Sequence, residues 1–282
     1  MRIRNNTAKE ISVEFDSLHE LLSTAEKGPE YITDTSWAGG FARETARKIR
    51  EGCATSNKDM EKARGIMDAV DTSFRDREVN QWMPSIAGAY PVVPDYLIGM
   101  PESMRERRPV ESDHAPIKMF VEVSYSAGVS ADAISQRGTA LAALLMRMAE
   151  ERPVELHLFV GWALKYNSGR RMIWSVKLDT NPISLQQVMD TIACKGFCRA
   201  INFNACNALN KDLQQEACQR NEPFYWAFSG DYRKEKLREH FQLEEKDILI
   251  ERGYLDDESL MKTDPVEWVH RQLEKQRALD DN

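Results

Sequence analysis

The sequence predicts an α/β protein with a mixed β-sheet, preceded by a mainly helical N-terminal part. Two observations support this class. From residue 117 onwards, short apolar runs typical of buried strands alternate with longer runs of helical periodicity. Two of these strands, 154–165 and 171–179, are joined by a short segment containing Gly169, which is typical of a hairpin. A sheet that combines a hairpin with strand–helix–strand crossovers contains antiparallel and parallel strands.

The first 110 residues are expected to form mostly helices and loops. The first helix starts at a capping box made by Ser17 and Glu20 and stops at Gly28. Two more are expected within residues 41–52 and about 57–76, and the former places Phe41, Thr45 and Ile49 on one face before Gly52.

Residues 82–110 contain five prolines, which at this density prevent a continuous helix or a central strand. We expect a loop that wraps the surface and separates the helical part from the sheet. The chain is thus divided into a helical N-terminal part with a Pro-rich loop, residues 1–110, and an α/β layered part, residues 111–282. The two parts are expected to form one compact unit.

The second part is expected to alternate strands and helices in the order strand, helix, strand, antiparallel strand, helix, helix, strand, helix. The expected strands cover residues 117–124, 154–165, 171–179 and 247–253. The expected helices cover residues 132–150, 182–194, 204–218, 231–241 and 265–279. Pro182 opens the second of these helices and Pro265 opens the last, as proline is favoured in the first turn.

The composition is that of an ordinary soluble globular protein, with 42% hydrophobic and 29% charged residues in 282. No apolar run approaches the ~20 residues that span a bilayer, and the N-terminus lacks the apolar core of a signal peptide. We therefore expect an intracellular protein without a membrane partner. The five cysteines are expected to be reduced, and those at 194, 198, 206 and 218 to be buried thiols on helices rather than zinc ligands.

The net charge of −7 is unevenly distributed along the chain. Residues 165–238 carry 12 basic and 7 acidic side chains, a balance of +5, whereas residues 1–164 balance at −5 and residues 239–282 at −7. A basic stretch of this kind can bind a polyanion locally in an acidic protein, although a surface of mixed charges is an equal alternative.

Basic and aromatic residues are interleaved in two parts of the basic stretch, as single-strand binding requires: cations follow the phosphates and flat rings stack on bases. The candidate DNA-binding residues are Lys165, Tyr166, Arg170, Arg171, Trp174, Lys177, Tyr232, Arg233, Lys234, Lys236 and Arg238. Stacking is expected from Tyr166, Trp174 or Tyr232. The alternative for the neighbouring aromatics is a place in the core, which we favour for Trp226 and Phe228.

The loop after the first strand of the layered part, Glu122-x-Ser124-x-Ser126, resembles the Asp-x-Ser-x-Ser metal loop of von Willebrand A-type domains. The strand, helix, hairpin, helix order that follows also resembles that fold and implies its strand order. The resemblance implies a divalent cation held by Glu122, Ser124 and Ser126, since hard cations take oxygen ligands. Glu122 is longer than the family's aspartate, so a Ser-rich turn capping the next helix is the favoured alternative.

Motifs for catalysis are absent from the sequence: it has no P-loop, no G-x-G-x-x-G after a strand and no G-x-S-x-G elbow. The histidines form no metal or catalytic pair, and His157 is expected to be a core or half-buried residue of its strand. We therefore expect a protein that is not an enzyme and that needs no cofactor.

Three segments, 36–52, 88–104 and 196–209, resemble motifs that recur in this order in proteins of tailed bacteriophages: W-x-G-G followed by a helix, Y-L-x-G-x-P-x-x-M, and a third element beginning at Gly196. The second motif departs from its usual pattern at Pro94. Within this group the chain is most similar to single-stranded-DNA-binding cofactors of phage RNA polymerases. The resemblance implies a phage-encoded protein of the host cytoplasm that binds single-stranded DNA and a phage RNA polymerase.

Two further interpretations remain open at this stage. One is a von Willebrand A-like protein-interaction scaffold, with or without a divalent ion. The other is a homo-oligomer, because the sequence does not specify the oligomeric state. The acidic residues Asp280 and Asp281 resemble the acidic tails with which single-strand binders recruit partners, and such a tail competes with DNA for a basic surface.

Overall fold

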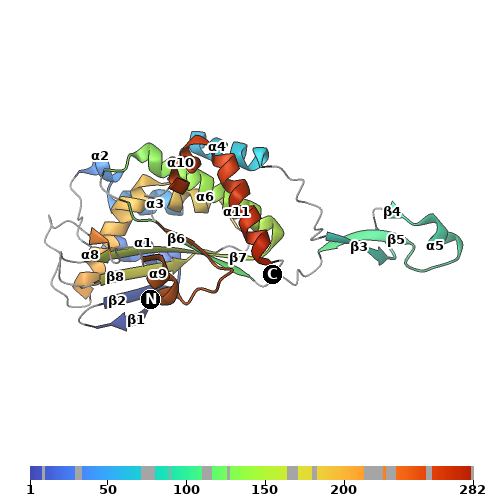
Figure 1. The fold of residues 1–282 in the computed structure, drawn as a ribbon, viewed down its shortest axis with the longest axis horizontal. Helices are drawn as coiled ribbons and strands as arrows, with labels where there is room; N and C mark the ends of the chain where they lie inside the picture. Colours follow the sequence, from blue (N-terminus) through green and yellow to red (C-terminus); the bar gives the residue numbers. More distant parts are fainter. Residues whose placement is uncertain are drawn as a thin grey trace.

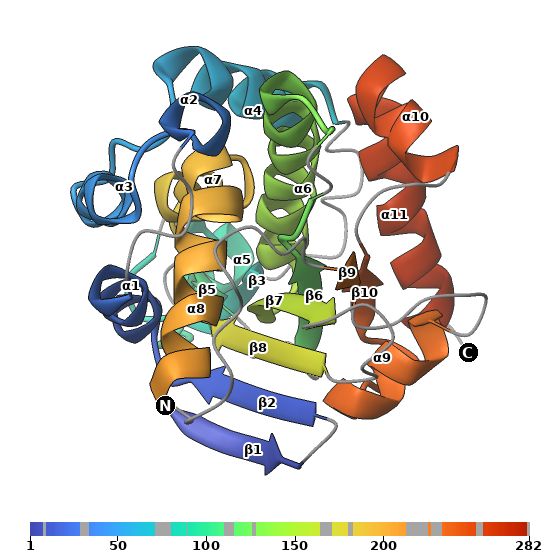
Figure 2. The ribbon, with the colours of Figure 1, turned by 90° about the vertical axis from the view of Figure 1, so that its left-hand side faces the viewer.

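The computed structural model confirms an α/β fold with a mixed sheet and a helical N-terminal part. It describes residues 1–7, 10–28, 34–70, 80–88, 90–109, 116–125, 128–163, 171–179, 183–212, 225–226, 233–251 and 256–280. The main sheet has the order β1-β2-β8-β7-β6-β10, and β9 also pairs with β7 (Figure 1; β9 and β10 are labelled in Figure 2). Its strands are β1 Arg2–Asn6, β2 Glu10–Phe15, β6 Ile117–Glu122, β7 Val154–Ala163, β8 Arg171–Lys177, β9 Tyr225–Trp226 and β10 Ile248–Ile250.

The predicted hairpin and crossover are both present. Strands β7 and β8 are antiparallel, with His157 opposite Lys177 and Ala163 opposite Arg171. Strand β6 leads through helix α6, Ala131–Glu151, to β7, which is its parallel neighbour, and β10 is parallel to β6 on the other side. The turn predicted between β7 and β8 lies outside the described residues.

The first two strands were not predicted. β1 is antiparallel to β2, and β2 is parallel to β8, with Ile11 opposite Met172 and Phe15 opposite Val176. The apolar alternation in β2 covers only Ile11, Val13 and Phe15, which is too short to separate a strand from a loop by pattern alone. Its parallel partner lies some 160 positions further along the chain, so the pairing that joins β2 to the rest of the sheet is not a local one.

The helices agree with the predictions in order and differ at several ends. α1 begins after Ser17, whose side chain accepts a hydrogen bond from the Glu20 amide, but the Glu20 carboxylate bonds the Asp16 amide rather than that of Ser17. α4 ends at Ala69, well before residue 76. The helices are α1 Leu18–Lys27, α2 Thr35–Ala38, α3 Ala42–Arg50, α4 Asn57–Ala69, α7 Leu185–Ile192, α8 Asn202–Asp212, α9 Arg233–Phe241, α10 Asp256–Thr263 and α11 Pro265–Asp280.

Four helical segments differ from expectation. α7 starts after Ser184, whose hydroxyl accepts from the Gln187 amide, rather than at Pro182. A π-helical turn, Phe197–Ile201, precedes α8, and α10 was not predicted at all. Phe41 lies just before α3 and is 48% exposed, whereas the buried face of α3 is made by Ala42, Thr45, Ala46 and Ile49.

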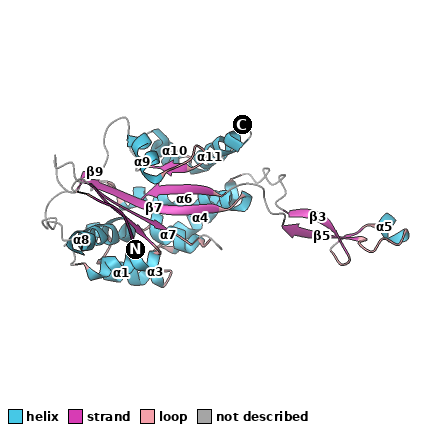
Figure 3. Cartoon of the chain, turned by 90° about the horizontal axis from the view of Figure 1, so that it is seen from below, coloured by secondary structure: helices cyan, strands magenta, loops and turns pink. Residues whose placement is uncertain are grey.

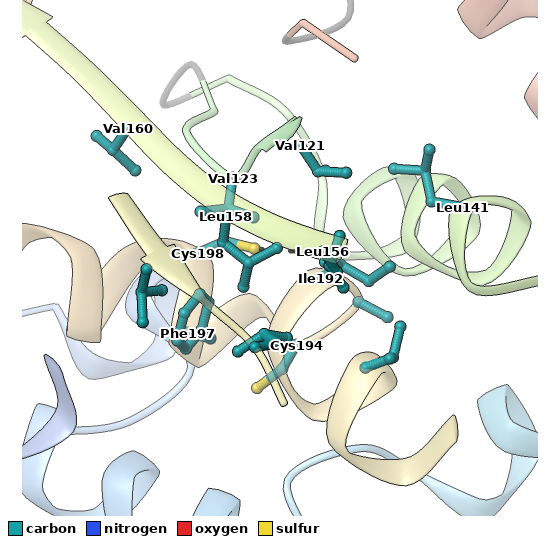
Figure 4. Close-up of a cluster of buried hydrophobic side chains, with 14 of the residues drawn as sticks. Val121, Val123, Leu141, Leu156, Leu158, Val160, Ile192, Cys194, Phe197 and Cys198 are labelled. Atoms are coloured by element: carbon teal, nitrogen blue, oxygen red, sulfur yellow. Dashed lines mark hydrogen bonds between the residues drawn. The ribbon is translucent and has the colours of Figure 1, made fainter. Parts of the chain in front are cut away.

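One face of the sheet is covered by helices and carries the main core. The period of two along a strand places Ile11, Val13 and Phe15 on this face, together with Val121, Leu158 and Trp174 from other strands. Figure 2 shows α1, α8, α7 and α6 on this side of the sheet. At its centre, Val121, Val123, Leu156, Leu158 and Val160 pack against Leu141 of α6 and against Ile192, Cys194, Phe197 and Cys198 (Figure 4).

The other face has a small second core beneath α9. Phe120, Phe159, Ile173 and Leu249 of the strands pack against Leu237 of α9, with Phe241 and Leu243 at the edge. Figure 3 places α9 on the side of the sheet away from α1 and α8. The alternating charged and polar residues of this face include Glu10, Arg171, Lys177, Glu155 and Glu122, and its electrostatics therefore differ sharply from those of the helix-covered face.

The Pro-rich segment was predicted to be a loop on the surface, and that prediction is wrong. It forms a second sheet of order β3-β5-β4, with β3 Asn80–Ser85, β4 Tyr90–Pro91, β5 Met104–Pro109 and a short helix, α5 Val93–Leu97. Pro84 and Pro91 are tolerated because β3 and β4 are edge strands, where a missing N–H costs no ladder hydrogen bond. We call residues 80–109 the arm; Figure 1 shows it extending from one end of the layered body.

Candidate functional site

The loop after β6 lies where α/β sheets bind ligands. In the sheet, β6 has β7 as its neighbour on one side and β10 as its neighbour on the other. The chain continues from β6 to β7, and the later strand β10 is added on the opposite side, so the strand order reverses at β6. Ligands bind outside the carboxyl ends of strands at such a point. The residues found there are Glu122 and Ser124 from β6 and its loop and Glu251 after β10.

Glu122 is fully buried at this point and is held by an arginine from α9. The Arg233 Nη2 atom donates to both carboxylate oxygens at 2.8 Å, and the Ser124 hydroxyl donates to Oε1 at 2.7 Å. Arg233 Nη1 also donates to Glu251 Oε1 at 2.5 Å. A buried carboxylate requires a counter-charge and hydrogen bonds, and Arg233 supplies both.

Arg137 of α6 completes the cluster from the helix side. It is 2% exposed, and its Nη1 atom donates to the Tyr125 hydroxyl at 2.8 Å and to the Glu122 carbonyl at 3.2 Å. Its Nη2 atom donates to the Glu251 carbonyl at 2.7 Å. We call Glu122, Ser124, Tyr125, Arg137, Arg233 and Glu251 the Glu122 network.

The geometry favours a structural role for Glu122 over the metal alternative. Both of its oxygens already accept from Arg233, so the guanidinium lies where a cation would bind. Ser126 lies outside the described residues, and within the described ranges no three His, Cys, Asp or Glu side chains are grouped as metal ligands. The cap of α6 is provided by Ser130, which accepts from the Ala133 amide at 3.1 Å. The hydroxyls of the loop thus divide their roles between the helix cap and Glu122.

Strand geometry separates the predicted binding residues of β8. Trp174 faces the helix-covered core, is fully buried and contacts Phe15 edge-on at 6.2 Å between centroids, so it is not placed to stack on a base. Arg171 and Lys177 share the other face but stand at opposite ends of the strand, ~20 Å apart. Arg171 pairs with Glu10 at 3.0 Å and Lys177 with Glu155 at 2.8 Å.

The cations of α9 fall into two groups. Arg233 is part of the buried network, and Arg238 donates to the carbonyls of Asp247 at 3.1 Å and of Glu244. Both arginines therefore stabilise the fold around α9 by their hydrogen bonds. Lys234 and Lys236 are exposed, and neither belongs to an ion pair within the part of the chain that the structure describes.

The described ends of the two basic and aromatic segments pair with each other through β9 and β7. Trp226 lies opposite Trp162, and Tyr225 opposite Ala163, so residues 225–226 extend the end of β7. The segment that continues beyond Ala163 and the segment that leads into α9 therefore start at one end of the sheet. Lys165, Tyr166, Arg170 and Tyr232 belong to these segments and lie outside the described residues.

The first and third sequence motifs pack against each other. Arg199 lies 4.2 Å above the Trp37 ring, and its Nη1 atom donates to the Trp37 carbonyl at 2.6 Å. The other guanidinium nitrogen donates to the Val129 carbonyl, in the loop that precedes α6. Phe203 contacts both Trp37 and Trp162, which joins the motifs to β7. The two motifs therefore build one structural unit beside the loop after β6.

Three of the described cysteines and His157 agree with a core role, whereas Cys53 is exposed. Cys194, Cys198 and Cys206 are buried, and burial raises the pKa of the Cys194 and Cys198 thiols. His157 stacks on Phe120 at 4.4 Å between ring centroids, and burial lowers its pKa. Burial therefore favours the neutral forms of the Cys194 and Cys198 thiols and of the His157 imidazole.

Sequence reasoning missed Arg137, Arg199 and Glu251, which tie the loop after β6 to three other elements. Arg137 directly precedes Gly138–Met146, a run of residues without charge. An arginine next to such a buried helix segment indicates a buried guanidinium with hydrogen-bond partners inside the protein. Nothing in the sequence identifies its partners, because they come from β6, its loop and the end of β10.

Fold and site together define an α/β protein with a mixed sheet and a buried ion-pair network at the carboxyl ends of β6 and β10. The family model for Domain of unknown function (DUF7192) matches residues 3–279, and the chain belongs to this family. Neither a curated protein nor a solved structure matches the chain. No helix in the described ranges is long and apolar enough to cross a membrane.

Proposed function

We propose that this protein binds single-stranded DNA without catalysing a reaction and acts as a cofactor of a phage RNA polymerase in the host cytoplasm. The observation that carries the proposal is the pairing of β9 with β7, because it joins the two basic and aromatic segments at one end of the sheet. The resemblance of the three sequence motifs to proteins of tailed bacteriophages, a group that includes single-stranded-DNA-binding RNA-polymerase cofactors, supports the same function.

The geometry narrows the set of residues that can contact DNA. Trp174, Arg233 and Arg238 have structural roles, and Arg171 and Lys177 are held in ion pairs. Lys234 and Lys236 are the described cations that face solvent beside these segments. The proposed interface thus combines them with Lys165, Tyr166, Arg170 and Tyr232, and its affinity comes mainly from phosphate contacts with stacking by the two tyrosines.

The test is fluorescence anisotropy of a labelled 30-nucleotide single strand and of the matching duplex over a range of salt concentrations. We expect preference for the single strand and a log–log salt slope of about −0.7 per phosphate neutralised. K234E/K236E should weaken binding and reduce the slope by roughly 1.4, since two phosphate contacts are lost.

The matched control is K262E/K275E, which changes the net charge equally at two exposed lysines on α10 and α11. It should leave the slope unchanged. Absence of single-strand binding at low salt would overturn the proposed function. Equal weakening by both double variants would show a response to net charge alone and would remove α9 from the interface.

A von Willebrand A-like interaction scaffold is the second candidate. The observation that favours it is the strand order β8-β7-β6-β10. This part of the sheet contains the strand, helix and hairpin whose order along the chain resembles that fold. If the scaffold depends on a divalent ion, EDTA should lower the thermal midpoint and Mg²⁺ restore it. An unchanged midpoint would exclude a stabilising ion.

A further inference from the structure

Two histidines lie in the contact between α9 and the face of the sheet beneath it. His240 is the last but one residue of α9, and His157 belongs to β7; their side chains are 15% and 11% exposed. A row of four rings joins them in the order His157, Phe120, Phe241, His240, with successive centroids 4.4, 4.5 and 4.8 Å apart. Both imidazoles are therefore part of the contact by which α9 covers the sheet.

His240 faces a carboxylate that is already paired. Its Nε2 atom lies 3.2 Å from the Ser12 hydroxyl, and its Nδ1 atom lies 3.6 Å from Oε1 of Glu10. The other oxygen of Glu10 lies 3.0 Å from Nη2 of Arg171, and the charge of Arg4 on β1 also disfavours a cation at His240. Burial lowers the pKa of His240, and the attraction of Glu10 offsets only part of this effect.

His157 has the same kind of surroundings. Its Nε2 atom lies 3.6 Å from Oε2 of Glu155, whose other oxygen is paired with Lys177 at 2.8 Å. Burial lowers the pKa of His157, and the charge of Lys177 acts in the same direction, against the weaker attraction of Glu155 and Glu14. Each histidine is thus a buried imidazole beside a carboxylate that a closer cation already neutralises.

The turn after α9 depends on contacts with the rest of the protein. Gln242 has a φ of 53°, a left-handed conformation that favours glycine at this position of a helix end. Such a backbone persists where surrounding contacts impose it. Phe241 and Leu243, on either side of Gln242, pack against the second core and supply these contacts.

We propose that α9 is a pH-sensitive cover of the sheet, which loosens when His240 and His157 are protonated and exposes the aromatic side chains beneath it. The bonds of Arg233 to Glu122 at the start of α9 contain no histidine, so the loosening should begin at the end that carries His240. The proposal does not depend on DNA binding.

The direction of the pH effect follows from the position of the proton. Each histidine binds its proton less tightly when α9 is docked, so the docked state has its full stability above about pH 6.5. As the pH falls from there towards the pKa of the docked histidine, each histidine should increase the opening constant of α9 by up to about tenfold per pH unit.

Hydrogen exchange of the full chain tests the proposal, measured by mass spectrometry between pH 7.5 and 5.5 and corrected for the intrinsic exchange rate at each pH. The opening constant of residues 233–241 should rise up to about 100-fold between pH 6.5 and 5.5, since two histidines contribute. The amides of α6, which lies on the other face of the sheet, should keep their protection. An opening constant of α9 that is independent of pH would refute the proposal, and so would an equal rise in α6, which would show global unfolding instead.

The variant H157F/H240Q removes both ionisations, while it keeps a ring on Phe120 and a polar side chain beside Ser12 and Glu10. It should abolish the pH dependence of α9 exchange, and each single variant should remove one histidine's share of it. The control H19Q changes an exposed histidine on α1 and should leave the pH dependence as in the wild type. Circular dichroism at pH 7.5 verifies folding, and the single variants decide if the double variant does not fold. A pH dependence that persists in both single variants would overturn the role of the histidines.

Discussion

Removing the Arg233 guanidinium should destabilise the protein more than any surface substitution, because Glu122 is then left buried without its counter-charge. In R233A the carboxylate keeps the Ser124 hydroxyl but loses both 2.8 Å bonds from Nη2, and Glu251 loses its bond from Nη1. Breaking a buried pair on one side costs ~3–5 kcal/mol. Since domains are stable by only ~5–15 kcal/mol, this loss is a large fraction of the free energy of unfolding.

The two partners should not be equivalent. E122Q leaves Arg233 paired with Glu251, whose side chain is 20% exposed, and keeps an amide oxygen as acceptor. Its cost should therefore be clearly smaller than that of R233A. The double variant E122Q/R233A no longer holds a buried unpaired charge and should be more stable than R233A alone.

Urea unfolding at pH 7, followed by circular dichroism, measures these differences as changes in midpoint at constant m-value. The control is R271A, which removes an arginine paired at 2.8 Å with Glu267 on the exposed face of α11 and should cost only ~0.3–0.5 kcal/mol. A loss below about 1 kcal/mol in R233A would contradict a buried pair. So would a double variant that is less stable than R233A. Loss of DNA affinity in R233A at unchanged stability would return Arg233 to the DNA interface.

Two further predictions concern helix packing and pH. A Cβ at Gly138 of α6 would lie 2.4 Å from the Ala193 Cα, so G138A should force α6 and α7 apart and cost ~1–3 kcal/mol. G65A on α4, where a Cβ meets nothing within 4 Å, should instead stabilise by ~0.5–1 kcal/mol; equal thermal midpoints for both variants would contradict the packing argument. Burial raises the pKa of Asp190 above 3.8, so the folded state binds its proton more tightly and this contribution to stability is lost as pH rises through the folded pKa. D190N lacks this ionisation and should gain stability relative to the wild type as pH rises from about 4 through the folded pKa of Asp190; parallel stability curves would contradict the assignment.

The sequence by itself determined the elements whose signals are local. The hairpin β7–β8, the crossover helix α6, the cap at Ser17 and the start of α11 at Pro265 all depend on residues within one or two turns of each other. Alternation along β8 also limits which residues can share a face. The alternation does not show which face of the sheet the helices cover. The coverage decided the role of Trp174, which is buried on the helix-covered face.

Only the tertiary structure decided the pairings between distant segments. β2 joins the sheet through β8, Glu122 is neutralised by an arginine 111 positions away, and β9 brings two basic segments together. The arm is a further case, since Pro84 and Pro91 lie on its edge strands and Pro109 is the last residue of its central strand, β5. In each case the partner of a backbone group or of a charge is distant in the sequence, and the local pattern does not specify it. The reason is that a buried polar group must be hydrogen-bonded or paired, and the group that does so is the one that the fold places beside it.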